Sequence, residues 1–359
     1  MFYREAGVFK TSYAADQALL TIPQDRRFMA VILAIAFIGI PITANDYWLS
    51  AIMMPFLVLS LAALGLNILT GYAGQLSLGT GGFMATGAFA AYKLATAFPD
   101  LNIIPVILIA GLITTAVGIL FGIPSLRIKG FYLAVATLAA QFFLIWMFNK
   151  FGWFTNYSAS GVIDAPPRAV FADIYVTGTE ATPLAKYLFT LTVVVVLTLL
   201  AKNLVRSHIG RAWMAIRDMD VAAEIIGIPM LATKLKAFAV SAFYCGVAGA
   251  LWAFLYTGAV EPLAFDVNRS FQVLFMIIIG GLGSILGAFL GAAFIVLLPI
   301  LLNNAPGLIG LTLPTDLVSH IEFMVFGALI IFFLIVEPHG LARLWAITKE
   351  KLRRWPFPY

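Results

Sequence analysis

Charged residues are scarce in this chain. Asp, Glu, Lys and Arg make up 11% of its 359 residues, whereas hydrophobic residues make up 62%. A soluble globular domain carries about 25% charged residues, so this composition excludes one, and most of the chain must be solvated by lipid or by its own helices. The excess of Lys and Arg over Asp and Glu, 22 against 17, is therefore interpreted by its position along the chain and not as a nucleic-acid signal.

Residues that catalysis or metal binding would need are also missing. The single cysteine, Cys245, excludes an intrachain disulfide and a cysteine-based metal site. The three histidines, His208, His320 and His339, form neither an i, i+4 pair nor an HExxH motif. No lysine follows a glycine, so the chain has no GxxxxGK[ST] loop for ATP phosphates. We therefore predict no catalytic, cofactor or metal site, and any energy from ATP must come from another polypeptide.

Long apolar stretches are abundant, and they predict the fold. About 30 Å of hydrocarbon needs about 20 residues of helix. Such stretches lie near residues 28–44, 47–69, 76–98, 103–121, 131–149, 187–205, 237–257, 284–302 and 321–336. Together they predict an all-α integral membrane protein.

One apolar stretch, 271–302, is too long for a single crossing and contains GGLGS at 280–284. Glycines favour a tight bend, so we expect a hinge at Gly280, Gly281 and Gly283 near the inner surface, preceded by a short half-span at 271–281. Broken helices are tolerated at membrane depth where protein or a cavity covers the backbone. The predicted fold is thus a polytopic bundle of about ten transmembrane helices with broken and half helices.

The basic residues predict the orientation of this bundle. With both termini in the cytoplasm, four of the 22 Lys and Arg residues lie outside, Lys93 lies within a span and 17 lie inside. The four outside are Lys150, Arg168, Lys186 and Arg269. Such a bias toward the cytoplasmic side fixes orientation. It divides the chain into a cytoplasmic N-terminal segment (1–27), a transmembrane domain (28–336) with an external loop at 150–186 and a polar segment at 206–234, and a basic cytoplasmic tail (337–359).

The polar segment 206–234, called the coupling segment below, is the most informative part of the chain. It is a charged, alanine-rich helical stretch between two apolar spans, with an AAxxxG spacing at Ala222, Ala223 and Gly227. Small residues permit close approach of another surface, and the glycine permits a turn at the helix end. A solvated connecting helix is the simpler interpretation, but placement between two spans on the basic side favours a docking element. Its expected contact residues are Gly210, Arg211, Ala215, Arg217, Asp218, Ala222, Ala223, Glu224 and Gly227.

A glycine-rich block at 71–87 carries most of the remaining polar side chains. One interpretation is close helix packing, since small residues dominate helix contacts in membranes. The other is a translocation path, and the two are equally favoured by the sequence. The candidate path residues are Asn67, Thr70, Gln75, Ser77 and Thr80.

Ionisable residues inside the predicted spans are few, and Glu261, Asp266, Arg269 and Glu337 all fall near predicted ends. Ion-coupled carriers usually keep an acid at mid-membrane, so its absence argues against proton or sodium coupling. Aromatic residues such as Trp146 and Trp252 are expected at the membrane interface or against lipid. In the external loop, Trp153, Phe154 and Tyr157 are candidates for docking an external protein.

Five blocks of sequence now suggest a family. The coupling segment resembles the EAA loop of bacterial ABC importer permeases, with Val221 where that pattern has Glu. Its stretch GRAWMAIRDMDVAAEIIGI is similar to the LivM branch of the branched-chain amino acid permease family. So are LNILTGYAGQLSLGTGGFMATGAFAAY at 66–92, PSLRIKGFYLAVATLA at 124–139, IIGGLGSILGAFLGA at 278–292 and EPHGLARL at 337–344. The resemblance runs from about residue 55 to 345 in the same order.

This resemblance implies a bacterial inner-membrane importer permease with the type II-like fold. It implies four kinds of partner: a second, homologous permease subunit, two cytoplasmic ATPases that hold ATP and Mg, a periplasmic solute-binding protein, and membrane lipid. The implied solute is a branched-chain or related amino acid. Relatives carry urea, short amides, or aromatic and other small carboxylates, and these remain open, as does a stand-alone ion-coupled carrier or a membrane-embedded enzyme.

Overall fold

The computed structural model describes residues 9, 11–12, 23–126, 132–158, 160–170, 175–178, 180–308, 315–337 and 339–354. Most of the predicted N-terminal segment 1–27 lies outside the described residues, as do Arg127 and Lys129.

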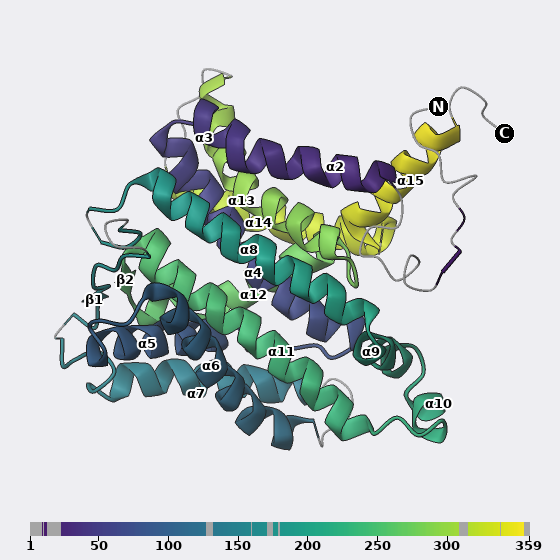
Figure 1. Ribbon diagram of the computed structural model, residues 1–359, viewed down its shortest axis with the longest axis horizontal. Coiled ribbons are helices and arrows are strands. Elements are labelled where there is room, and N and C mark those ends of the chain that lie inside the picture. Colours follow the sequence, from purple (N-terminus) through teal and green to yellow (C-terminus); the bar gives the residue numbers. More distant parts are fainter. Residues whose placement is uncertain are drawn as a thin grey trace.

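The described chain is helical along nearly its whole length (Figure 1). Its helices, with four short π-helical stretches (η1–η4) and one 3-10 turn (η5), are α2 (Pro23–Ala34), η1 (Ile35–Gly39), α3 (Ile40–Thr43), η2 (Trp48–Met53), α4 (Met54–Asn67), η3 (Ile68–Tyr72), α5 (Thr80–Ala97), α6 (Ile103–Ser125), α7 (Tyr132–Lys150), α8 (Pro183–Arg206), α9 (His208–Asp218), α10 (Asp220–Ile225), α11 (Met230–Leu251), η4 (Trp252–Thr257), η5 (Pro262–Phe265), α12 (Val267–Gly280), α13 (Ile285–Leu308), α14 (Thr315–Val336) and α15 (Gly340–Arg354).

Eight helices in the described residues are long and apolar enough to cross a membrane. They correspond to predicted spans in the same order, and α5 and α14 occupy the two remaining predicted spans, 76–98 and 321–336. The predicted all-α bundle with broken helices is therefore confirmed. The coupling segment was expected as one helix, but α9 and α10 are separated at Met219, whose backbone is extended (φ −157°, ψ 91°).

The coupling segment and the ends of the described chain share one end of the bundle. In Figure 1, α9, α10 and α15 lie at the right, opposite β1 (Ile163–Asp164) and β2 (Ala259–Val260). The start of α2 packs on α15, where Phe28 and Trp345 stack with ring centroids 6.3 Å apart and Lys349 Nζ lies 3.4 Å from the Asp25 carboxylate. This arrangement agrees with the expected placement of the coupling segment and the basic tail on the same side.

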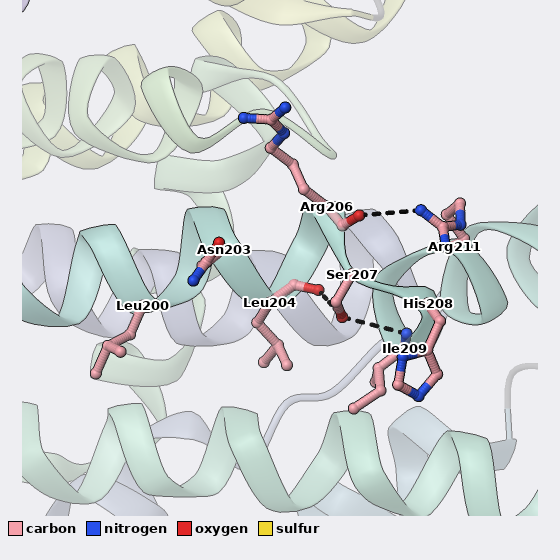
Figure 2. Close-up of a pocket in the computed structure, with 8 residues that line it drawn as sticks. All are labelled: Leu200, Asn203, Leu204, Arg206, Ser207, His208, Ile209 and Arg211. Atoms are coloured by element: carbon pink, nitrogen blue, oxygen red, sulfur yellow. Dashed lines mark hydrogen bonds between the residues drawn. The ribbon is translucent and has the colours of Figure 1, made fainter. Parts of the chain in front are cut away.

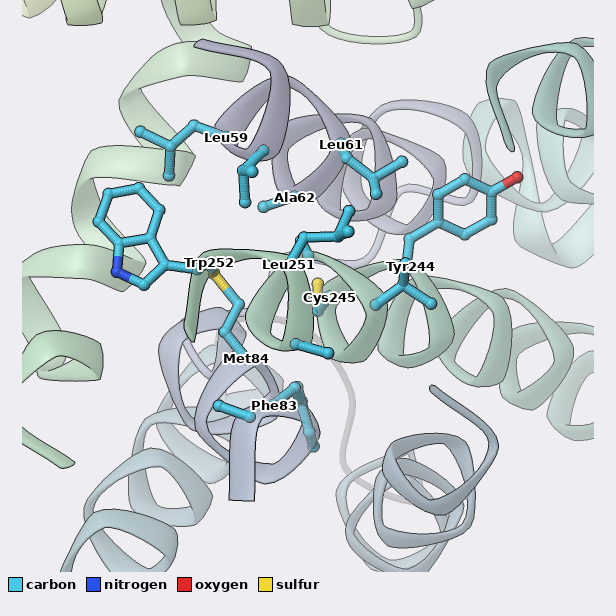
Figure 3. Packing of buried hydrophobic residues seen from close by; sticks show 14 of the residues in the cluster. Leu59, Leu61, Ala62, Phe83, Met84, Tyr244, Cys245, Leu251 and Trp252 are labelled. Atoms are coloured by element: carbon cyan, nitrogen blue, oxygen red, sulfur yellow. The ribbon is translucent and has the colours of Figure 1, made fainter. Parts of the chain in front are cut away.

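Helix α11 forms the centre of the bundle and contacts α4, α5 and α6. Small residues bring the backbones together: a Cβ on Gly87 of α5 would lie 2.0 Å from the carbonyl oxygen of Gly246 in α11, and a Cβ on Gly246 would meet Thr114 of α6 at 2.4 Å. Figure 3 shows the apolar side chains of α4, α5 and α11 around this region. Dispersion and close packing, rather than hydrophobic transfer, hold helices together in lipid.

Helix α12 begins at about half the depth of the bundle. The Gln141 Nε2 atom donates to the Phe265 carbonyl at 2.8 Å, and Gln141 is the middle residue of α7. The Ser270 hydroxyl accepts from the Gly81 amide at 2.8 Å, which joins the first turns of α12 and α5. The predicted half-span is thus confirmed as a short helix, but it begins at Val267 rather than at 271.

At the opposite end, a two-stranded sheet fixes the long loop 150–186. Strand β1 pairs antiparallel with β2, with Ile163 opposite Val260. The loop 150–186 is thereby fixed to the link between α11 and α12. It forms no separate domain among the described residues.

Candidate functional site

The coupling segment is built by two reversals of the chain. Ser207 ends α8 and caps α9, since its Oγ accepts from the Ile209 amide at 3.2 Å. At the far side, α10 ends in a turn in which Gly227 takes a left-handed conformation (φ +88°) and the Ile228 amide donates to the Ala223 carbonyl at 3.0 Å. A six-to-one hydrogen bond with glycine at this position is a common helix stop, so the role predicted for Gly227 as a turn is confirmed.

One face of α9 is fixed to the membrane helices. Trp213 is buried, and its Nε1 donates to the Thr233 carbonyl of α11 at 3.1 Å. Gly210 lies so close to α8 that a Cβ would stand 2.0 Å from the Val205 carbonyl oxygen. Gly210 therefore positions α9 and does not present a contact surface, and the same holds for the buried Ala223 in α10.

The other face of the coupling segment is exposed and apolar. Met219, Val221, Ile225 and Ile226 are all exposed, with Ile225 at 81%. Among the expected contact residues, Arg211, Arg217, Asp218, Ala222, Glu224 and Gly227 are exposed and Ala215 is half-buried. The sequence analysis missed the four apolar residues, although apolar side chains in a polar segment outside the spans were a signal for them. Such a surface is typical of a protein interface.

A hollow of about 600 Å³ lies at the corner between α8 and α9 (Figure 2). The corner is held by hydrogen bonds to main-chain oxygens, from the Ser207 hydroxyl to Leu204 at 2.6 Å and from Arg211 Nη1 to Arg206 at 3.2 Å. The bonds make the corner a rigid connection between the span α8 and the coupling segment.

Arg217 joins the coupling segment to the interior. Its Nη1 donates to the Gly71 carbonyl at the end of η3 at 2.9 Å, and its Nε donates to Asp218 Oδ1 at 2.8 Å. A Cβ on Gly283, in the bend after α12, would lie 3.1 Å from the same Nη1. Arg217 thus lies where the end of the second span meets the α12–α13 bend.

Asn67 closes this contact from the α4 side. Its Nδ2 donates to the Ser284 carbonyl at 2.7 Å and its Oδ1 accepts from the Gly283 amide at 2.9 Å. A Cβ on Gly71 would lie 2.2 Å from the Gly283 nitrogen. We call Asn67, Gly71, Arg217 and Gly283 the junction.

The predicted bend at Gly280, Gly281 and Gly283 lies at the junction, at the same end as the coupling segment. α12 ends at Gly280, and Gly281 and Gly283 have positive φ angles of 118° and 73°. A Cβ on Gly281 would lie 2.6 Å from the His339 carbonyl oxygen, so the start of α15 also packs here. Four parts of the chain therefore meet: the end of α4–η3, α9, the α12–α13 bend and the start of α15.

Most of the candidate path residues have structural partners. Asn67 holds the bend, the Thr70 hydroxyl donates to the Gln75 carbonyl at 3.0 Å, and the Ser77 Oγ accepts from the Gly79 amide at 3.4 Å. Thr80 is buried at the start of α5. Gln75 differs, because both atoms of its buried amide lack a hydrogen-bond partner in the described structure. Gln75 therefore keeps a polar group free for a passing solute or water.

At the opposite end, two of the three candidate docking residues are exposed and the third is half-buried. Trp153 and Tyr157 are exposed, the latter by 82%, and Lys93 Nζ stands 4.5 Å over the Trp153 ring. Phe154 instead packs edge-on against Phe148 with centroids 5.0 Å apart. Trp153 and Tyr157 therefore form a surface, which Phe154 supports from below.

A cavity of about 830 Å³ opens beside this surface, between α5, α6 and α7. Its lining is mainly aliphatic and aromatic, with Lys93, Thr86 and Asn156 among the polar members. Asn156 holds Lys93 through a hydrogen bond.

Comparison with known proteins gives consistent matches. The family model described as the branched-chain amino acid transport system permease component matches residues 48–334. The chain is 28% identical over 342 residues to the high-affinity branched-chain amino acid transport system permease protein LivM of Salmonella typhimurium, covering 89% of this chain and 75% of that protein. It is 29% identical over 314 residues to the Escherichia coli protein of the same description, covering 82% and 69% respectively.

A more distant relative is the probable branched-chain amino acid transport permease protein LivM of Methanocaldococcus jannaschii, 24% identical over 244 residues and 66% of each chain. No solved structure matches the chain.

Proposed function

The chain belongs to the branched-chain amino acid transport permease family, and we propose that it is the membrane subunit of an ATP-driven importer whose coupling segment is moved by a cytoplasmic ATPase. It is a multi-pass membrane protein with a permease role. We propose its energy source, its partners and its solute from the observations that follow.

The observation that carries the proposal is the hydrogen bond from Arg217 to the Gly71 carbonyl at 2.9 Å. Through it, the coupling segment contacts the end of the second span and, through Asn67, the α12–α13 bend. A force on α9 therefore acts directly on a broken helix that starts at mid-depth. Ligand-driven switches need such a contact between the binding surface and an element with two arrangements.

The partner surface is the exposed apolar face formed by Met219, Val221, Ile225 and Ile226. It is bordered by the acids Asp218, Asp220 and Glu224. We assign this face to an ATPase subunit, one of two that hold ATP and Mg, and we assign no catalytic role to the present chain. We place the chain in the bacterial inner membrane. With the ATPases on the cytoplasmic side, α15 and the start of α2 are on the cytoplasmic side as well.

The opposite end then faces the external binding protein. Trp153 and Tyr157 are exposed there, on a loop fixed by the β1–β2 pairing. The lipid-exposed apolar faces leave room for a second, homologous permease subunit, with which the chain shares the path. The span Asp25–Thr43 has none of its residues buried within this chain, which makes it the most peripheral of the eight.

The proposed solute is a branched-chain or related amino acid, the solute named in the relatives' descriptions. Urea or short amides, and aromatic or other small carboxylates, are the alternative solutes. A carrier or enzyme working alone is the alternative of a different class. The exposed apolar face of the coupling segment favours the importer, because a chain working alone has no use for it.

Cysteine cross-linking tests the partner assignment. The native Cys245 is buried, so a cysteine introduced at Ile225 is the accessible thiol in the described structure, and Tyr157→Cys serves as the control at the opposite end. We expect I225C to cross-link to a co-purifying ATP-hydrolysing polypeptide, with a yield that changes on adding ATP, whereas Y157C does not. An active, solitary chain, or a cross-link from Y157C only, would overturn the proposal.

The same purified complex identifies the solute. We expect proteoliposomes that contain it, together with its binding protein, to accumulate radiolabelled leucine on addition of ATP. Uptake of urea or benzoate in place of leucine would select one of the alternative solutes.

A further inference from the structure

Arg269 lies deeper in the bundle than its sequence position indicates. It was expected outside, near the end of a span, but the chain turns inward after β2 through η5, so that Phe265 contacts the middle residue of α7. Arg269 lies in the first turn of α12, one helical turn beyond this contact. Its depth is therefore within the membrane, where an ionisable side chain is costly and is usually kept for function.

Arg269 stacks on an aromatic ring from α11. Its Cζ lies 4.2 Å from the ring centroid of Trp252. Trp252 was expected at the membrane interface or against lipid, but it is 6% exposed, and it lies six residues beyond Gly246, which packs against the middle residue of α6. At 1.5 Å per residue this places Trp252 about 9 Å from the mid-plane, on the side of β1 and β2.

Two donors at this position have capacity for a ligand. The Trp252 Nε1 atom is buried and has no hydrogen-bond partner in the described structure. Figure 3 shows this nitrogen on the side of the ring turned away from Leu59 and Leu251. Arg269 donates from Nε to the Ala264 carbonyl at 3.3 Å and from Nη1 to Gln272 Oε1 at 2.7 Å, with no hydrogen bond found for Nη2 among the described residues.

The charge of Arg269 also has no direct ion pair among the described residues. The Asp266 carboxylate interacts with it electrostatically, but that carboxylate is used as the cap of α12, since its Oδ1 accepts from the Arg269 amide at 3.2 Å and its Oδ2 accepts from Asn268 at 2.8 Å. A cation taken out of water is stabilised by an anion with matching hydrogen-bond geometry, and guanidinium matches carboxylate.

We propose that Arg269 and the indole N–H of Trp252 form a transient carboxylate-binding site for the solute on the outer half of the translocation path. The inference rests on the proposed importer function and names the chemical class that the path selects: small solutes with a free carboxylate, over neutral amides and urea. The stacked indole holds the guanidinium plane in place, so the site is formed before the solute arrives.

Uptake kinetics test this site. The complete importer is reconstituted in proteoliposomes with the same partner proteins and binding protein in every arm, so that differences report on this chain alone. The variants are Arg269→Gln, Arg269→Lys and Trp252→Phe. The matched control is Lys186→Gln, which removes a positive charge at the start of α8, on the side of β1 and β2.

We expect R269Q to raise the KM for leucine uptake on the order of 10- to 100-fold, the range for loss of a hydrogen bond to a charged group. R269K keeps the charge but loses the planar guanidinium with its paired N–H donors, and W252F keeps an aromatic ring but loses the N–H. Each of these two variants should raise the KM for leucine uptake by roughly 3- to 10-fold. Basal ATP hydrolysis and the K186Q variant should stay at wild-type values. Isocaproate, which has the carboxylate of leucine, should compete for uptake by the wild-type importer, whereas isocaproamide should not.

Leucine uptake with a KM within twofold of wild type in both R269K and W252F would overturn the site, whatever R269Q does to assembly. A wild-type importer that accumulates urea but not leucine would overturn it as well, while leaving the importer function intact. A wild-type complex that accumulates no solute with ATP contradicts the proposed function itself, and this result differs from both of the others.

Discussion

Replacement of Arg217 tests whether force passes through the junction. Arg217→Ala removes two contacts at once, the hydrogen bond to the Gly71 carbonyl at 2.9 Å and the ion pair with Asp218 at 2.8 Å. A control is needed for the second contact. Asp218→Asn removes the ion pair and leaves the Gly71 contact in place.

The magnitudes of the two contacts differ. A hydrogen bond that involves a charged group contributes about 1.5–3 kcal/mol. The Arg217–Asp218 pair has side chains 36% and 64% exposed, and such surface pairs contribute about 0–1 kcal/mol because solvent screens them. The Gly71 contact therefore dominates. Its loss, at about 2 kcal/mol, changes an equilibrium between two arrangements about 30-fold.

The assay measures leucine uptake and ATP hydrolysis in the same proteoliposomes. We expect R217A to hydrolyse ATP at near wild-type rates while losing most uptake per ATP, and we expect D218N to keep both. Lys236→Gln controls for removing an exposed positive charge next to the coupling segment, at the start of α11. Uptake per ATP that is unchanged in R217A, or reduced equally in D218N, would refute the assignment of force transmission to the Gly71 contact.

Three further predictions concern the same region. Gly71→Ala places a Cβ 2.2 Å from the Gly283 nitrogen and should lower the stability of the protein by about 1–3 kcal/mol through overpacking. Thermal unfolding in detergent measures this loss, with Gly327→Ala as the control, because a Cβ at Gly327 meets nothing within 4 Å. Trp213→Phe removes the hydrogen bond to α11 and should lower stability by about 1 kcal/mol in the same assay; an unchanged unfolding temperature would contradict the role of Trp213 in holding α9. Ile225→Glu puts a charge on the exposed apolar face and should abolish co-purification of the ATPase without affecting membrane insertion; full retention of the ATPase would exclude this face as the interface.

Much of the fold could be predicted from local sequence. The order of the spans follows from apolar length, the bend at 280–284 from its glycines, and the turn at Gly227 from the one residue type that readily takes φ +88°. These features are local, because hydrophobic length and glycine conformation depend on few neighbours.

The contacts that form the junction could not be predicted in this way. Asn67 and Ser284 are 217 residues apart in sequence, and no local pattern pairs them. The break between α9 and α10 at Met219 involves neither glycine nor proline, so helix propensity gives no sign of it. The predicted position of Arg269 outside the bundle was wrong. A hydropathy pattern gives the order of spans along the chain, but it cannot detect that the chain folds back into the bundle through Pro262–Phe265.

The crossing of α5, α6 and α11 at Gly246 fixes how α11 can move. Because the backbones of α5 and α11 meet there, we expect α11 to tilt about that point rather than to slide. Gly246 lies sixteen residues from Met230 and six from Trp252, so the two arms are about 24 Å and 9 Å long. A displacement of the end at Met230 would then arrive at Trp252 in the opposite direction and at somewhat over a third of its size, so that in the proposed importer one mouth of the path would open as the other narrows.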